Sequence, residues 1–527
     1  MSLASQQRAR GLGAVAASLI KRILVGSLAA CGLLLVASSA RANDIYLGQG
    51  SGAGNGVDCA DAYPSSWFNN SSNWGTGASQ IGPGTTVHLC GTITGAAGAT
   101  GLTFQGSGSS GHPITLLFEN GAVMTSPQWG VAITSTAKNY ITIDGGSNGL
   151  IQNTQSGTLL SYHNATVGIS IAGGNSVEIR NLNISNMYVH TGTGSDGGSA
   201  GGIAFQPGAL NNLSIHNNTI HDAHSSIFIG YTSLNGADIY RNTTYNQVWG
   251  IALLDDNVGS TATNVNVHDN DVHDFANWFD TGFNFHFDGI FFAATEASTS
   301  LTNSNIYNNY IHGAMNVNGT GYIYLTGSSG GLSGINIFNN VIVTSVSGTG
   351  SPEANIVLGF GPKNIRIVNN TLVSGEGIRI RDSGSSGNVI QNNIFYSCWM
   401  AIEVYANNSV SVSNLNVFNN LNGGASGHWF AWYGTWEADL PAWQSASRFD
   451  ANSVTGSPSL DANYHPQTGS SAIRTGVNLT NLGIAALNAD KAGTPRPSTG
   501  NWDIGAYQNG SAAAGPAAPS GLTAVVQ

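Results

Sequence analysis

The stretch Ile335-Asn-Ile-Phe-Asn-Asn-Val-Ile342 shows a pattern that recurs along the chain. Apolar residues take alternate positions and are followed by two asparagines. The same template is found at residues 213–220, 265–272, 304–311 and 365–372. Apolar residues repeating with period two are typical of a β-strand. The repeat therefore predicts a series of short strands, each ending at asparagine.

The spacing of the repeat predicts a solenoid. Aligned on the second asparagine, eight copies follow each other at intervals of 24, 28, 39, 31, 30, 23 and 27 residues. The aligned residues are Asn218, Asn242, Asn270, Asn309, Asn340, Asn370, Asn393 and Asn420. A minimum near 23 with a variable excess indicates a coil of fixed length that carries insertions. Periods of this size are typical of solenoids.

A second apolar strand recurs between these copies. Nine such strands begin at Gly168, Gly202, Ser226, Gly250, Gly289, Tyr322, Asn355, Gly377 and Ala401. Because one coil cannot bury its own apolar face, the coils are expected to stack about 4.8 Å apart in parallel sheets. Asparagine tolerates the left-handed backbone of a sharp bend, and its amide can bond the same amide one coil further on. The predicted fold class is therefore all-β, with a structural asparagine ladder.

These coils resemble a known superfamily. The IxNNxI segments, together with Asn488-Ala-Asp-Lys-Ala-Gly-Thr-Pro-Arg-Pro497 and Trp502-Asp-Ile-Gly-Ala-Tyr507, resemble the right-handed parallel β-helix proteins of the pectate-lyase-like superfamily. The resemblance covers roughly residues 85–507. It implies a right-handed parallel β-helix solenoid with N- and C-terminal caps. That superfamily holds polysaccharide lyases, glycoside hydrolases and uronate epimerases, so the resemblance does not fix the reaction.

The N-terminus predicts export. Lys21 and Arg22 precede an apolar run at residues 23–36, and Ser38-Ser-Ala-Arg-Ala42 follows. This order is typical of a signal peptide, here residues 1–42, and predicts a secreted protein, extracellular or periplasmic. Lipoprotein processing at Cys31 is the alternative. No other stretch has the roughly 20 apolar residues of a spanning helix, so no membrane span is expected.

Charge and composition narrow the partners. Loss of residues 1–42 would remove five of the 16 Lys and Arg and none of the 27 Asp and Glu, which moves the net charge from −11 to −16. Nucleic acid is therefore not an expected partner. Charged residues make up only 8% of the chain, and its 71 glycines suit tight turns. A monomer acting on a polysaccharide is expected.

The remaining segments are interpreted as caps and a linker. Residues 43–84 are predicted as an N-terminal cap with a short helix in 60–69, and residues 85–423 as the β-helix. Residues 424–510 are predicted as a C-terminal cap with a helix at 440–446. Residues 511–527 read as a linker that resembles the start of a truncated fibronectin type III module.

Three cysteines follow the predicted cleavage site. In an exported protein, Cys59 and Cys90 are expected to form a disulfide that fastens the N-terminal cap to the first coil. Cys398 lies in a strand repeat and is expected to be a buried free thiol.

Acids and histidines gather in the middle of the chain. Between His216 and His312 lie seven of the 13 histidines and nine aspartates but a single cation, Arg241. Asp222 and Asp274 take the same turn position two coils apart, which places them about 10 Å from each other. An inverting carboxylate pair is separated by roughly 6.5–9.5 Å. The predicted catalytic carboxylates are Asp222, Asp256, Asp274 and Asp288.

Aromatic residues crowd the insertion at residues 275–287. Aromatic rings suit the apolar faces of sugars, so this insertion is expected to form one wall of a binding groove. The predicted substrate-binding residues here are Phe228, Trp278, Phe285, His286, Phe291 and Tyr324. The alternative is a local hydrophobic cluster beside aspartates that merely cap turns.

A second patch is basic. Arg379 and Arg381 are expected to point outward and to bind substrate. Their predicted neighbours are Lys363, Arg366, Glu376 and Glu403. The alternative interpretation is an ordinary surface arginine ladder with acidic partners.

The histidines are expected to stack in columns with tyrosines. His221, Tyr245, His273 and His312 form one predicted column, and His216, Tyr240, His268 and Tyr307 another. No zinc motif has the required spacing, so no metal site is predicted and no cofactor is expected. Calcium is the alternative, because many carboxylate and amide oxygens converge in this region.

Together these features predict an exported carbohydrate-active enzyme that cleaves a polysaccharide in a groove along the β-helix. The first hypothesis is an inverting glycoside hydrolase, in which one carboxyl group protonates the leaving oxygen and another activates water. Because cations are scarce in the groove, a neutral or weakly charged substrate is favoured. The alternatives are a polysaccharide lyase or uronate epimerase assisted by calcium or by Arg and Lys, and a non-catalytic surface or adhesion protein.

Overall fold

The computed structural model describes residues 44–50, 52–155, 165–187, 201–230, 233–255, 258–275, 286–315, 318–327, 331–345 and 353–509. Several predictions fall outside these residues. They concern the signal peptide 1–42 with Cys31, the linker 511–527, and the site residues Asp256, Trp278 and Phe285.

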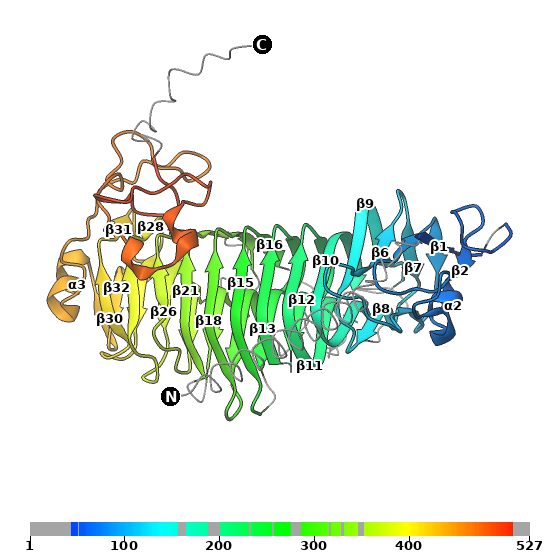
Figure 1. Ribbon diagram of the computed structural model, residues 1–527. Coiled ribbons are helices and arrows are strands. Elements are labelled where there is room, and N and C mark those ends of the chain that lie inside the picture. The colour runs from blue at the N-terminus through cyan, green and yellow to red at the C-terminus, as the bar shows by residue number, and fades with distance from the viewer. Residues whose placement is uncertain are drawn as a thin grey trace, which may run out of the picture. The chain divides into compact units, whose positions relative to one another are not determined.

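The strands wind into coils that lay down three sheets (Figure 1). Sheet 1 contains β5 (Thr100–Thr103), β8 (Val131–Thr136), β17 (Phe287–Ala294), β20 (Gly319–Thr326), β23 (Ala354–Gly359), β26 (Glu376–Ile380), β29 (Met400–Val404), β32 (Phe430–Trp432) and β33 (Thr435–Glu437). Sheet 2 contains β1 (Asp44–Gly48), β2 (Tyr63–Pro64), β3 (Thr86–Leu89), β6 (Ile114–Phe118), β13 (Ser233–Tyr240), β15 (Thr261–His268), β18 (Ser300–Tyr307), β21 (Leu332–Phe338), β24 (Arg366–Val368), β27 (Asn388–Gln391) and β30 (Val410–Asn414).

Sheet 3 contains β4 (Thr92–Thr94), β7 (Val123–Ser126), β16 (Asp271–Phe275), β19 (Tyr310–Ala314), β22 (Val341–Ser345), β25 (Thr371–Val373), β28 (Ile394–Tyr396) and β31 (Val417–Asn419). Five longer strands bend from one sheet into the next: β9 (Ile141–Asn153), β10 (Val167–Met187), β11 (Gly201–His216), β12 (Thr219–Gly230) and β14 (Thr243–Asp255). The short helices are α2 (Ser65–Phe68), α3 (Leu440–Ser447), η1 (Ser71–Asn73), η2 (Thr480–Leu482) and η3 (Ala485–Asn488).

The register of sheet 1 confirms the predicted first strands. One inward isoleucine of each strand pairs with the equivalent isoleucine of the next coil, and all nine are buried. They are Ile169, Ile203, Ile227, Ile251, Ile290, Ile323, Ile356, Ile378 and Ile402. The pairing is parallel throughout, so the predicted fold class, a right-handed parallel β-helix solenoid with capped ends, is confirmed.

The asparagine ladder is present, and two neighbouring residues in each coil have different roles in it. In each ladder pair the Nδ2 of one asparagine donates to the Oδ1 of the next, as in Asn309 to Asn340 at 3.0 Å. The residue before each ladder position has the left-handed backbone, with φ of 56° at Asn308 and 55° at Asn339. The paired asparagines are thus explained, because one makes the bend and the other fills the interior.

The ladder ends at a different residue from the one predicted. Asn393 donates to Asn416 and not to Asn420, because Ile394 pairs with Val417 in the next coil. The interval is then 23 residues, the minimum coil length. Asn420 instead has a left-handed backbone, with φ of 55°, and donates to Ser397 Oγ at 2.8 Å.

The N-terminal segment already contains a solenoid strand. β1 pairs in parallel with β3, from Asp44 opposite Thr86 onward, so pairing begins inside the segment predicted as a cap. The helix α2 has four residues and is shorter than the span predicted for it. Its Phe68 packs edge-on against Trp74 and Phe104, which forms a small aromatic core at this end.

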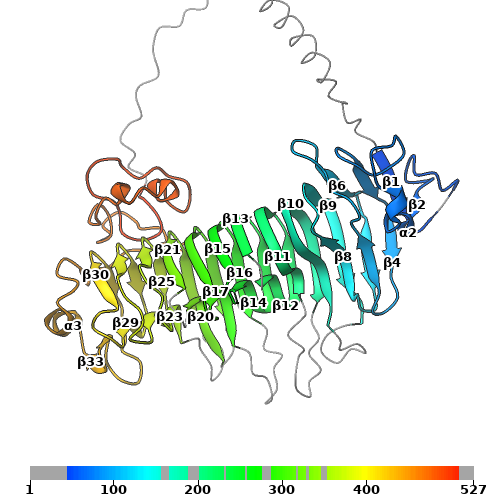
Figure 2. The ribbon, with the colours of Figure 1, turned by 60° about the horizontal axis from the view of Figure 1, so that its bottom comes forward.

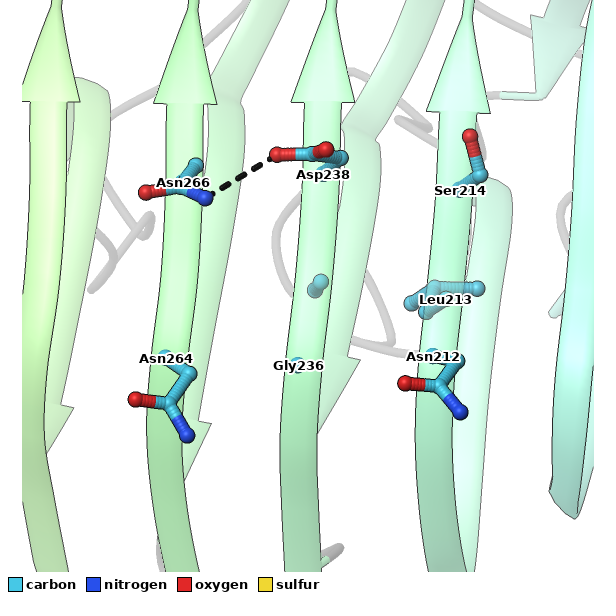
Figure 3. Close-up of a pocket in the computed structure, with 8 residues that line it drawn as sticks. Asn212, Leu213, Ser214, Gly236, Asp238, Asn264 and Asn266 are labelled. Carbon is cyan, nitrogen blue, oxygen red and sulfur yellow. Dashed lines mark hydrogen bonds between the residues drawn. The ribbon is translucent and has the colours of Figure 1, made fainter. Parts of the chain in front are cut away.

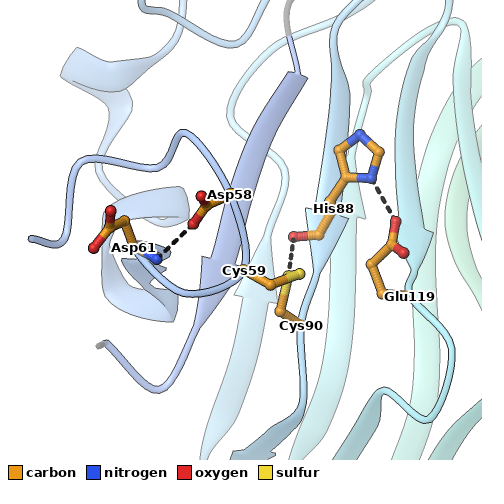
Figure 4. Close-up of a disulfide and its surroundings, with 6 residues drawn as sticks. All are labelled: Asp58, Cys59, Asp61, His88, Cys90 and Glu119. Carbon is orange, nitrogen blue, oxygen red and sulfur yellow. Dashed lines mark hydrogen bonds and ion pairs between the residues drawn. A yellow bond between two sulfur atoms is a disulfide. The ribbon is translucent and has the colours of Figure 1, made fainter. Parts of the chain in front are cut away.

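The predicted disulfide is confirmed. Cys59 and Cys90 are bonded and close a loop with a sequence separation of 31 (Figure 4). Cys90 directly follows β3, so the bond ties the loop before β2 to the first coil. Cys398 is a buried free thiol, as predicted.

Reduction of this disulfide should cost about 4 kcal/mol of unfolding free energy, because a loop of this length regains conformational entropy in the unfolded chain. The check is a denaturant melt with and without dithiothreitol. The double variant Cys59→Ser/Cys90→Ser should match the reduced protein and ignore the reductant. A wild-type melt that does not respond to reduction would contradict the expectation.

The C-terminal segment covers both an end and a side of the solenoid. α3 was predicted correctly and packs Trp443 against Phe430 of β32, with ring centroids 5.1 Å apart. The segment after Asp450 runs back along the coils (Figures 1 and 2). There the left-handed Asn339 and Asn369 donate to the carbonyl oxygens of Ala489 and Asp503.

Within the described ranges, no helix is long and apolar enough to cross a membrane.

Candidate functional site

Two of the predicted catalytic carboxylates occupy turns. Asp222 and Asp274 have left-handed backbones, with φ of 54° and 48°, and each accepts a hydrogen bond from the histidine before it. Asp222 also accepts from Asn246. Burial acts to raise the pKa of Asp222, but the hydrogen bonds from His221 and Asn246 outweigh it, so the pKa is lowered. Left-handed turns favour Asp and Asn for local reasons.

Asp288 lies in a different environment. It is near the start of β17, its side chain has no exposed surface, and its Oδ2 is 2.5 Å from His286 Nδ1. The other oxygen, Oδ1, accepts the backbone N–H of Gly321 at 3.2 Å. Trp249 Nε1 donates to the carbonyl oxygen of His286 at 2.8 Å and fixes the backbone beside the ring. His286 and Asp288 therefore form a held pair, called here the dyad.

The dyad sits among aromatic rings. The His286 ring meets Phe291 and Tyr324 edge-on, with centroids 5.0 and 5.6 Å away, while these two rings stack on each other at 5.0 Å. Phe228 stacks on Trp249 at 6.4 Å. The predicted substrate-binding residues Phe228, His286, Phe291 and Tyr324 are thus gathered on sheet 1.

The environment sets the protonation of the dyad. Burial acts to lower the pKa of His286, but the adjacent Asp288 carboxylate outweighs it and raises the pKa above the ordinary value of 6.5. The ring is 37% exposed, so it can exchange protons with solvent or ligand. Among the described residues no hydrogen-bond partner is seen for Nε2. Asp288 orients the ring through Nδ1, so Nε2 is the ring nitrogen that can exchange a proton.

A charged cluster continues sheet 1 beyond the aromatic rings. Arg379 Nη2 is 2.7 Å from Glu376 Oε2, and its Nε is 2.6 Å from Glu403 Oε2. Arg381 Nη1 is 3.3 Å from Glu353 Oε2, which also lies 3.6 Å from Arg379. These five residues are called the charged cluster. Two cations face three carboxylates, so the cluster is close to neutral.

Glu376 is the unusual member of the cluster. Burial raises its pKa well above the ordinary value of 4.5, against the lowering effect of Arg379 and with a further rise from Glu403. Its side chain has no exposed surface. Arg379 stays charged, because its carboxylate neighbours outweigh the effect of burial and raise its pKa.

The dyad and the charged cluster form one surface. The charges of Glu353 and Arg381 both act on the pKa of His286, and those of Asp288 and Arg381 act on Tyr324. From the sequence, these groups are predicted as two patches, one acidic and one basic. The strand register of the repeat could have predicted one surface, because Ile290 and Ile378 share one register position and Asp288 and Glu376 each lie two residues earlier.

The predicted basic patch is divided between two sheets. Lys363 forms β-bridges with Ser333 and Ser386 on sheet 2, and Arg366 of β24 donates to Asn336 there at 3.2 Å. Arg379 and Arg381 belong to sheet 1. The prediction that all four share a surface is therefore wrong, because the chain turns from sheet 2 through sheet 3 between them.

A shallow hollow of about 310 Å³ lies on sheet 2, away from the dyad (Figure 3). It opens where Gly236 leaves a gap between Asn212 and Asn264. Asp238 accepts from Asn266 Nδ2 at 3.1 Å beside the gap. Its lining belongs to the outer amide ladder that continues through Asn305.

The predicted ring columns are confirmed. His221, Tyr245, His273 and His312 stack with centroid separations of 4.7, 5.1 and 4.8 Å. His216, Tyr240, His268 and Tyr307 form the second column. In the part of the chain that the structure describes, no group of three or more His, Cys, Asp or Glu is placed to hold a metal ion.

Comparisons with known proteins do not assign this chain to a family. No family model and no curated protein sequence matches the chain. The pectate lyase Pel9A is 15% identical, with 89% of this chain and 98% of that chain covered and a TM-score of 0.36. A family 28 exopolygalacturonase of Yersinia enterocolitica is 11% identical, with 64% and 72% covered and a TM-score of 0.34. At such scores the likeness carries no argument, and the fold assignment rests on the strand register.

Proposed function

We propose that this protein cleaves a uronate-containing polysaccharide by β-elimination, with His286 as the base. The observation that carries the proposal is the dyad, in which buried Asp288 holds Nδ1 of an imidazole that is 37% exposed. An imidazole oriented in this way can take up a proton near neutral pH. The surrounding rings and guanidinium groups suit a ligand with apolar faces and a carboxylate.

The proposed step uses groups on one face of sheet 1. His286 Nε2 takes the proton from C5 of a uronate, the electron pair forms the C4–C5 double bond, and the C4–O4 bond breaks. The imidazolium returns the proton to the leaving oxygen. Arg381, which is 33% exposed, gives up its contact with Glu353 and binds the substrate carboxylate instead. Asp288 stabilises the imidazolium.

Hydrolysis by a carboxylate pair is the second candidate. It needs one protonated and one ionised carboxyl group that both reach the substrate. On this face the carboxyl group with the raised pKa, Glu376, has no exposed surface. Glu353 is partly buried, and its Oε2 contacts Arg381. The geometry therefore favours elimination over the hydrolase hypothesis, with Glu353 as the residue on which hydrolysis would depend.

The test is a screen over polygalacturonate, alginate and xylan with two detectors. Elimination should give new reducing ends together with the absorbance of an unsaturated uronate on an acidic polymer. Reducing ends without that absorbance would replace elimination by hydrolysis. Binding without either signal would leave a carbohydrate-binding solenoid and end the enzymatic proposal.

The dyad predicts the pH dependence of the reaction. A base works in its neutral form, so kcat/KM should rise with pH through the pKa of His286, which lies above 6.5. Asp288→Asn removes the charge that raises this pKa, so the ascending limb should move to lower pH even where the rate is small. A limb that stays in place in this variant would exclude His286 as the titrating base.

The same pair affects stability. Because the folded pKa of His286 is raised, its contribution to folding is fully present below the ordinary pKa of 6.5 and is lost as pH rises through the folded value. As pH rises from 6.5 through the folded pKa of His286, the thermal midpoint of the wild type should therefore fall more than that of Asp288→Asn. Equal pH dependence in both proteins would contradict the pairing.

A further inference from the structure

The exposed aromatic residues lie in one region. The described residues contain four exposed large aromatic side chains, Phe360, Tyr405, Tyr433 and Trp436, with 55, 49, 63 and 47% exposed. All four lie in or directly after strands of sheet 1, next to β23, β29, β32 and β33. The other exposed large apolar side chains are valines. Grouped exposed aromatic surface is a feature of binding sites.

The row continues directly from the charged cluster. Arg381 donates its backbone N–H to Leu358, Tyr405 to Ile380 at 3.1 Å, and Tyr433 to Val404 at 2.7 Å. Each of the three thus lies one coil beyond the previous one, and the spacing is about 4.8 Å. The two tyrosines therefore extend away from Arg381 across the strands.

Trp436 belongs to the same face. It pairs with Ala431 in the antiparallel β32–β33 hairpin, so both side chains point to one side. Ala431 follows Glu403 in register, and Glu403 follows Arg379. The outward row of sheet 1 therefore passes from the charged cluster to an indole.

The backbone at two of these positions is held in a costly conformation. Phe360 and Tyr433 have φ of 56° and 51°. Bulky residues other than glycine seldom adopt this left-handed region. At Tyr433 this conformation belongs to the two-residue turn Tyr433-Gly434 of the β32–β33 hairpin, which places the tyrosine at the tip of the hairpin.

We propose that Tyr405, Tyr433 and Trp436 form a stacking platform for the sugar rings of a polysaccharide chain that crosses the strands of sheet 1, from the dyad towards β33. The identity of that polymer rests on the proposed function. With 49, 63 and 47% of their surface exposed, these three aromatic residues can contact the apolar faces of sugars. Arg381 beside them, which is 33% exposed, can bond hydroxyl groups. The charged cluster then lies between two aromatic regions, one around Tyr324 and one at the platform.

The test is affinity electrophoresis in gels that contain polygalacturonate, alginate or xylan, with His286→Gln as the parent so that the polymer is not cut. Adding Tyr405→Ala and Tyr433→Ala should weaken binding at least about tenfold, equivalent to ~1.4 kcal/mol. Val412→Ala is the matched control, because Val412 is 37% exposed on sheet 2. It should leave binding unchanged, and all variants should keep their thermal midpoints within a few degrees.

Two outcomes would overturn the platform. One is unchanged binding after loss of both tyrosines. The other is a change in oligomeric state on size-exclusion chromatography, which would make the row an interface between copies of this chain. The two proposals can fail separately. If the wild type forms no product but polymer binding is lost when both tyrosines are replaced, the cleavage proposal is wrong and the platform stands. Absence of binding to every polymer overturns both proposals.

Discussion

Replacing His286 by glutamine is expected to lower kcat by about 10²–10⁴, the usual cost of removing a positioned acid or base. Glutamine keeps a polar side chain beside Asp288 but cannot accept the proton at Nε2. Because the ring lies at the surface rather than in the core, the thermal midpoint should move by only a few degrees. Turnover of the uronate polymer and a thermal melt on the same preparation check the expectation.

A second histidine gives a matched control for this variant. His221 Nδ1 lies 2.5 Å from Asp222 Oδ2, the same separation as in the dyad, but its ring is stacked on Tyr245. His221→Gln should therefore stay active.

The carboxylates first predicted as catalytic provide the result that would contradict a catalytic role for His286. If Asp222→Asn and Asp274→Asn abolish turnover while His286→Gln remains active, the site lies at the turns between sheets 3 and 1. The hydrolase hypothesis would then replace elimination.

Replacing Asn309 by alanine is expected to remove about 4 kcal/mol or more of unfolding free energy. The Asn309 side chain donates to Val267 O at 2.9 Å and to Asn340 Oδ1 at 3.0 Å. It also accepts from the backbone N–H and the Nδ2 of Asn270. Alanine leaves these buried groups without partners, and each unsatisfied group costs about 1–3 kcal/mol.

The outer amide ladder gives the control in the same coil. Asn305 donates to Asn266 Oδ1 at 2.8 Å and accepts from Asn336 Nδ2 at 2.9 Å, but water can replace these bonds at the surface. Asn305→Ala should therefore cost less than about 1 kcal/mol. Chemical denaturation of both variants gives the comparison. Equal losses would mean that burial of the inner ladder does not determine its contribution.

The candidate site was predicted in part. The sequence predicted Asp288, Phe291, Tyr324 and the two arginines from countable strand positions, and His286 from its place in the aromatic insertion at residues 275–287. It gave Asp288 a catalytic role, while the structure places this residue behind His286 with no exposed surface. Burial of one carboxylate and exposure of another depend on neighbours from other coils, and no local pattern records them. Glu353 was missed because it stands outside the repeat.

The fold of this protein was predictable from its repeat alone. Successive coils place the same kind of residue at the same position, so one local pattern fixes the strand register, the ladder and the ring columns. Parallel stacking converts a repeat along the chain into contacts between coils. The disulfide was predictable from the predicted export signal and the cysteines that follow it, and the buried Cys398 from its place in a strand repeat.

Which charged groups share a surface depends on how the coils stack. Lys363 and Arg379 lie 16 residues apart but on different sheets, whereas Asp288 and Glu376 lie on one sheet although they are 88 residues apart. Because corners and insertions differ in length, residues that are close in the sequence can lie far apart in space, and residues far apart in the sequence can lie close together. The Asp288 carboxylate that raises the pKa of His286 lies only two residues away in the sequence. The smaller effects of Glu353 and Arg381 on that pKa come from other coils, and they therefore exist only once the coils are stacked.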